Sequence, residues 1–192
     1  MMAGGTGRRL LRPEIVAAVA GLLVFLGYPP FGLFPALFIG PWLFLRVIRD
    51  VSPRRAILLG TIFGATFQAG GFYWIAGTVS RFYRIFPGGA DGGDGSLADW
   101  IGRGAFLVWW LGATLCWALW GYLLARAPRP PALRALWVVT TFGALEALYP
   151  RVFPWSLGSG LSEVSWLAQG GWWLGVAGLT AAIIGIAAAV EE

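Results

Sequence analysis

The chain has 192 residues, of which 58% are hydrophobic and 12% charged, with a mean hydropathy of +0.71. A soluble globular domain is nearer half apolar and a quarter charged, so this composition excludes that class and predicts an all-α, polytopic bundle of about six transmembrane helices. All fourteen basic residues are arginine, histidine is absent, and Cys116 is the sole cysteine. Imidazole chemistry, an internal disulfide and a two-thiol metal site are therefore excluded, and we expect no cofactor and no metal.

The apolar runs, taken in chain order, predict one transmembrane domain over residues 14–190. A basic N-terminus, 1–13, resembles the start of a signal peptide, but no small-residue cleavage site follows it, so we expect a retained anchor. The longest polar connection, 80–103, holds "FPGGADGGDGS" and is expected to be a flexible solvent loop. Residues 191–192 form a short C-terminal tail. The predicted spans are 14–28, 33–47, 56–79, 104–125, 132–149 and 164–190, with the first two forming a hairpin that turns at "YPPFG".

The arginines predict the orientation of these spans. Ten of them lie before the first span and in the two links on that same side, whereas the four on the opposite side are diluted by acidic residues. Short arginine-rich links stay in the cytoplasm. We therefore expect both termini inside a bacterial inner membrane, and both loop 80–103 and the stretch "VFPWSLGSG" outside it.

Small residues recur at spacings of three and four in two of the predicted spans, which places them on one helix face and permits close helix packing. In the third span these are Gly60 and Gly64. Gln68 continues that face and is expected to hydrogen-bond a neighbouring helix. The last span carries the longer series Gly171, Gly175, Gly178, Ala182, Gly185 and Ala189.

Glu146 is the sole carboxylate well inside a predicted span, about one turn before Pro150. An ionisable group there is costly and usually faces the bundle interior or a wet cavity. Two interpretations stay open: a functional carboxylate, or a structural hydrogen bond to backbone freed near Pro150 or to Arg151. Cys116 lies in the middle of an apolar span, where we expect a packing role.

Five stretches occur in a recognisable order: "YPPFGLFPAL", "RRAILLGTIFGATFQAGGFYWI", "ALWVVTTFGALEAL", "FPWSLGSG" and "LAQGGWWLGVAGLTAAI". This ordered set covers nearly the whole chain from Glu14 onward and resembles the N-terminal membrane region of apolipoprotein N-acyltransferase. The resemblance implies a part in bacterial lipoprotein biosynthesis, in which a phospholipid acyl chain is moved to the N-terminal amine of a lipoprotein. It implies phospholipid as a ligand; we expect no nucleic-acid partner.

The resemblance also implies a nitrilase-like domain with a Glu-Lys-Cys triad, which this sequence lacks. It has no lysine, and its one cysteine lies within a predicted span. Because nucleophilic catalysis needs an activated thiolate beside a base and an oxyanion site, we assign no catalytic residue and expect no catalysis by this chain alone.

Three functional classes follow from these observations. The first is the membrane module of an acyltransferase, truncated or paired with a separate catalytic domain. The second is a non-catalytic integral membrane subunit that binds lipid or a partner protein in a larger complex. The third is a small transporter served by Glu146 and Gln68, although no inverted repeat is apparent.

The outer ends of the third and fifth predicted spans and the re-entry stretch all reach the same membrane face. We predict that their aromatic and acidic residues line one lipid-accessible groove there. The alternative is a general aromatic belt that faces bulk lipid. The groove residues are Tyr73, Trp74, Glu146, Phe153, Pro154 and Trp155.

Overall fold

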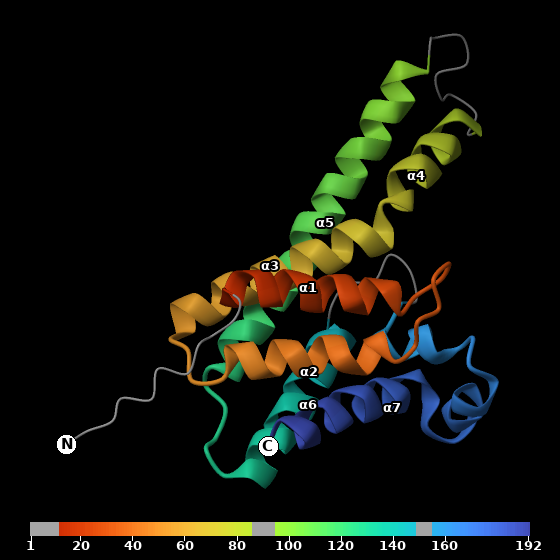
Figure 1. Ribbon diagram of the computed structural model, residues 1–192. Helices are drawn as coiled ribbons and strands as arrows, with labels where there is room; N and C mark the ends of the chain where they lie inside the picture. The colour runs from red at the N-terminus through yellow and green to blue at the C-terminus, as the bar shows by residue number, and fades with distance from the viewer. Residues whose placement is uncertain (1–11, 86–94, 149–154) are drawn as a thin grey trace.

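The computed structural model describes residues 12–85, 95–148 and 155–192, and within them it is built of helices without any strand (Figure 1). The all-α fold class is therefore confirmed. The helices are α1 (Pro13–Leu26), α2 (Ala36–Ile48), α3 (Pro53–Phe72), α4 (Trp74–Ile85), α5 (Ser96–Leu124), α6 (Pro131–Leu148), the 3₁₀ helix η1 (Leu157–Leu161) and α7 (Ser165–Glu191).

Among the described helices, α5 and α7 are each long and apolar enough to cross a membrane, and α3 with α4 makes a third candidate if the bent pair counts as one span. The apolar helices α1 and α2 have 14 and 13 residues. At 1.5 Å per residue each is about 20 Å long, which is less than the roughly 30 Å of a hydrocarbon core. A total of six spans thus stays a prediction.

The third predicted span, 56–79, is bent in the structure. The helix axis turns by 47° between α3 and α4, at Tyr73. Gly70 and Gly71 precede the bend and favour helix poorly, and the indole N–H of Trp74 donates to the carbonyl of Gly71 at 3.0 Å. After the bend, α4 leaves the bundle and runs beside the first half of α5 (Figure 1).

This pairing of α4 with α5 also replaces much of the predicted loop 80–103. Asp99 accepts hydrogen bonds from Ser80 at 2.6 Å and from Arg84 at 2.7 Å. Gly102 lets the backbone of α5 approach Ala76 of α4 closely. Helix therefore continues to Ile85 and resumes at Ser96, eight residues before the predicted start at Gly104. Residues 86–94, with the glycine-rich centre of the loop, lie outside the described residues.

The most extensive helix pairing in the bundle, α3 against α5, depends on glycines. A β-carbon at Gly60 would collide with the backbone carbonyl of Trp117, and one at Gly121 would collide with that of Ala56. Gly64 faces the indole ring of Trp117. The small face predicted on the third span therefore lies against α5, as membrane helices pack when small residues let their backbones meet.

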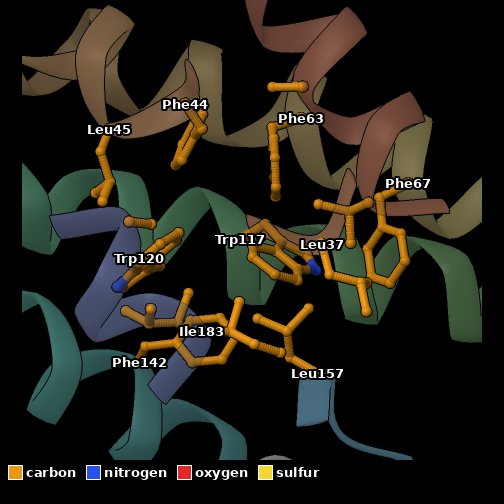
Figure 2. Packing of buried hydrophobic residues seen from close by; sticks show 14 of the residues in the cluster. Leu37, Phe44, Leu45, Phe63, Phe67, Trp117, Trp120, Phe142, Leu157 and Ile183 are labelled. Atoms are coloured by element: carbon orange, nitrogen blue, oxygen red, sulfur yellow. The ribbon is translucent and has the colours of Figure 1, made fainter. Parts of the chain in front are cut away.

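Aromatic side chains fill much of the core between the packed helices. Trp117 and Trp120 of α5 lie between phenylalanines from α2 and α3 on one side and residues of α6, η1 and α7 on the other (Figure 2). Ring centroids are 4.4 Å apart for Phe44 and Phe63, and 4.9 Å apart for Trp120 and Phe142. One aromatic cluster thus joins elements from most of the chain.

Ion pairs join the helix ends that carry most of the arginines, which we call the arginine end. Arg49, just after α2, lies 2.8 Å from Glu191 of α7, and Arg134 of α6 lies 3.0 Å from Glu192. The hydrogen bond to Glu191 raises the pKa of the Arg49 guanidinium above its ordinary value. Glu14 and Arg55 pair in the same way at the starts of α1 and α3, at 3.0 Å.

The glycine contact predicts a difference between two positions on the same helix. Gly121→Ala should destabilise the protein by about 1–3 kcal/mol, because the added carbon meets backbone that cannot move without parting the helices. Gly104 has no neighbour within 4 Å, so Gly104→Ala should be neutral or stabilising by up to about 1 kcal/mol. Denaturation in detergent micelles measures both, and equal losses would contradict the packing account.

Candidate functional site

Side chains from three parts of the fold hold the backbone at the start of η1. The Tyr28 hydroxyl lies 3.1 Å from the carbonyl oxygens of both Ser156 and Leu157. The N–H of Leu157 donates to Oε1 of Glu146 at 2.7 Å. The N–H of Gly158 donates to Oγ1 of Thr180 at 2.8 Å. The turn is thus fixed to the α1–α2 connection, to α6 and to α7.

Two glycines of η1 are placed where a side chain has no room. Gly158 lies against the backbone of Val176 and Thr180, and a β-carbon at Gly160 would stand 2.8 Å from a methyl of Leu37. Leu157 and Leu161 are buried on either side of them. The stretch "SLGSGL" is therefore an internal segment of the bundle. Its backbone N–H and C=O groups, buried away from water, therefore need partners within the protein.

Glu146 is the most strongly engaged polar side chain of this region. Besides the Leu157 N–H, its Oε1 has the hydroxyl of Thr180 at 3.4 Å. A carboxylate at a helix C-terminus is disfavoured by the helix dipole, and a charge-assisted bond from a backbone N–H offsets that cost. The structural interpretation of Glu146 thus has a definite partner, Leu157. Pro150 and Arg151, the partners predicted from the sequence, lie outside the described residues.

A cavity of about 60 Å³ adjoins Glu146, between α3, α5 and α6. One water needs only about 10–15 Å³ of such space, so the cavity has room for several. Gln68, 3% exposed, lines it, and its Oε1 has no hydrogen-bond partner among the described residues, contrary to the expected bond to a neighbouring helix. The lining residues are Gln68, Trp109, Ala113, Cys116, Trp117, Trp120, Phe142, Leu145, Glu146 and Trp155.

The structure brings together only part of the predicted groove. Glu146 and Trp155 line the same cavity, but Tyr73 and Trp74 do not. These two residues stand at the exposed bend between α3 and α4, 66% and 40% exposed. Phe72 lies between the two regions, with its ring 5.3 Å from that of Trp155 and 6.3 Å from that of Trp74. Phe153 and Pro154 lie outside the described residues.

Much of the cavity wall comes from α5, which sequence reasoning did not assign to a site. Its lining residues follow one another at helical spacing, so they share a face: Trp109, Ala113, Cys116, Trp117 and Trp120. That spacing is a signal that the sequence contains. It cannot separate a cavity wall from ordinary packing, which is the role expected for Cys116.

The glycine series of α7 does not form one packing face. Gly175 has a φ of 65° and interrupts the helix. Gly171 and Gly178 face leucines of α7 itself. A β-carbon at Gly185 would lie 3.7 Å from Val139 of α6, an ordinary packing distance.

Comparison with known proteins bears directly on this arrangement. Residues 20–90 match the family model of the apolipoprotein N-acyltransferase N-terminal domain. The resemblance to apolipoprotein N-acyltransferase is confirmed. Proteins of that name from Caulobacter vibrioides, Pseudomonas syringae and Vibrio cholerae are 32%, 29% and 28% identical to this chain, over 74%, 89% and 81% of its length.

The chain spans only 26–34% of the length of these three relatives. The similarity covers only that part of each relative, so it does not assign the activity of the whole relatives to this chain. The apolar helices and the bacterial relatives together describe a bacterial membrane protein.

The bond between Glu146 and Leu157 predicts a graded effect on stability. Glu146→Ala leaves a buried N–H without its acceptor and should cost about 1–3 kcal/mol. Glu146→Gln keeps an acceptor and should recover part of that loss. Glu163 is an exposed carboxylate just after η1, so Glu163→Ala should change stability by less than about 0.5 kcal/mol. Unfolding in detergent tests the series, and a Gln variant as unstable as the Ala variant would contradict the assigned role.

Proposed function

We propose that this chain is the membrane module of a phospholipid-to-lipoprotein acyltransfer system, and that it holds the phospholipid rather than performing the chemistry. The observation that carries the proposal is the tryptophan-lined cavity beside the fixed turn η1, in a chain that contains the family's N-terminal domain. A site that is mostly apolar with a few polar groups is typical of small-molecule binding.

The shape of the cavity limits what it accepts. A space of about 60 Å³ takes the end of an acyl chain, not a whole lipid. The rest of the lipid would lie outside the cavity.

The acyl transfer itself would require a catalytic domain as partner. The nucleophile, base and oxyanion site of an acyltransferase have to meet within hydrogen-bond distance. Cys116 is the sole thiol of the chain, and it packs on an apolar wall made chiefly of tryptophans. The alternative, a non-catalytic subunit that binds lipid for a larger complex, uses the same cavity.

We further propose that the arginine end faces the cytoplasm, as the arginine count predicts. The ion pairs that gather the ends of α2 and α7 with the start of α6 support a common side for these arginines. A reagent that cannot cross the membrane should then label Asp91→Cys, in a Cys116→Ser background, from outside intact cells. Labelling from the cytoplasmic side alone would reverse the orientation.

Filling the cavity should weaken phospholipid binding. Ala113 lines the cavity and is 2% exposed, whereas Ala105 lies two turns earlier on α5, outside the lining. Ala113→Leu should reduce phospholipid retained by the detergent-purified chain several-fold, measured by native mass spectrometry, while Ala105→Leu should leave it unchanged. Equal retention in both variants, with both folded, would remove the cavity from the proposal.

The proposed division of labour predicts no turnover by this chain alone. Purified chain, mixed with phospholipid and a diacylated lipopeptide, should transfer no acyl group above the background rate. Cys116→Ala is the control for an unexpected thiol reaction. Turnover that persists in Cys116→Ala would show that other residues of this chain are catalytic.

A further inference from the structure

The helix α7 is folded back on itself at Gly175. This residue has φ 65° and ψ 174°, a conformation open essentially to glycine alone. The side chain of Leu179 lies 3.2 Å from the place of a β-carbon on Gly171 and 3.7 Å from that on Gly170. In a straight helix residues eight apart are separated by about 12 Å. The segment 165–174 therefore turns away from the axis of 176–191.

This first segment turns its tryptophans outward. Trp172 and Trp173 are 88% and 86% exposed, and Trp166 is 67% exposed. Neighbouring residues of a helix point about 100° apart, so a wide sector of the segment has no cover from the described residues. Trp166 also meets Phe34 edge to face at 6.4 Å. The segment therefore lies beside the connection between α1 and α2, to which Phe34 belongs.

The composition of residues 165–174 indicates what surrounds their exposed face. No charged residue lies between Glu163 and Glu191, which leaves no charge complementarity for a polar protein surface. Tryptophan is enriched where membrane meets water, because its ring is apolar and its N–H is a donor. The segment has few polar residues, and none of them is charged. Ser165 and Gln169 border an open hollow beside Trp172 and Trp173.

The length of α7 is compatible with a lipid environment for residues 165–174. The 27 residues of α7 would make a straight helix of about 40 Å, longer than the roughly 30 Å of a hydrocarbon core. Folding at Gly175 leaves residues 176–191, about 24 Å, to run through the bundle. We propose that residues 165–174 form an in-plane helix at the membrane interface, with Trp172 and Trp173 among the lipid headgroups and Gly175 as its corner.

The proposed interfacial helix is linked by packing to the turn at η1. Gly158 of η1 packs against Val176 and Thr180, the first turns of α7 beyond the corner. A helix held at the interface therefore sets the depth at which η1 and Glu146 lie in the bilayer. This inference does not depend on phospholipid being a substrate.

The fold at Gly175 can be tested with a disulfide. In a Cys116→Ser background, Gly171→Cys with Leu179→Cys should cross-link on mild oxidation in vesicles, because the fold brings the two positions together. Two cysteines more than about 7 Å apart between α-carbons cannot be bridged, so a straight α7 would give no cross-link. The pair Ala181→Cys with Ala189→Cys is the control; both positions are exposed, have the same spacing without an intervening break and should stay reduced. A reduced test pair, or oxidation of both pairs, would overturn the fold-back.

The position of the segment can be tested by quenching. The full chain, carrying a fluorophore at Trp173→Cys in the same background, is reconstituted in phosphatidylcholine vesicles. A lipid spin label near the headgroup should quench it at least about twice as strongly as one near the end of the acyl chain, the expected order for an interfacial site. The control position Ile186→Cys, in the second half of α7, should show the reverse order.

Two results would contradict the interfacial position. Stronger quenching at Trp173→Cys by the deep label would make the segment part of a membrane span. Quenching by neither lipid label would mean that protein, such as a second copy of this chain, covers the tryptophans. Equal lipid retention in Ala113→Leu and Ala105→Leu would count against the cavity proposal, but it would not alter the cross-linking or the quenching result. The cavity proposal and the interfacial-helix proposal can therefore be tested separately.

Discussion

The bond from the Leu157 N–H to Glu146 is the interaction on which the arrangement of the second half of the chain depends. The chain has to leave α6, turn inside the bundle and enter α7, and the buried backbone groups of that turn need partners within the protein. Glu146, Thr180 and Tyr28 supply those partners from three elements. Because each partner comes from a different element, the turn also fixes how those elements sit together.

The two ends of the bundle are stabilised by different physics. At the arginine end, ion pairs link α2, α6 and α7 through Glu191 and Glu192, which are 5% and 12% exposed. The Arg49 side chain is itself 38% exposed, so its pair is screened by water, whereas Arg134 is 13% exposed and its pair is the more sheltered one. At the η1 end, hydrogen bonds and aromatic ring contacts hold the elements together, and Glu146 is the carboxylate among them. A further ion pair, Arg84 with Asp99 at 2.7 Å, joins α4 to α5.

The sequence predicted the helices and the packing face of Gly60 and Gly64 because both depend on local periodicity. It also singled out Glu146 and Trp155, since a lone carboxylate and a tryptophan beside a glycine turn are conspicuous in an apolar chain. The bend at Tyr73 and the fold at Gly175 depend on which of many glycines leaves the helical region, and tertiary contacts decide that. Tyr73 and Trp74 were placed in the groove by depth alone, but depth does not specify the direction in which a side chain points.

The glycine face of α3 and the cavity are parts of one arrangement. Gly64 has no side chain, so the side chain of Trp117 can approach α3 closely there. The ring of Trp117 also forms a wall of the cavity, and its centroid lies 5.5 Å from that of Phe142 of α6. A methyl group at Gly64 would have to displace the ring, and the open space next to it is the cavity. The small residues that let α3 and α5 meet therefore also determine how much room is left between α5 and α6. A packing motif predicted from spacing alone thereby sets the dimensions of the candidate site.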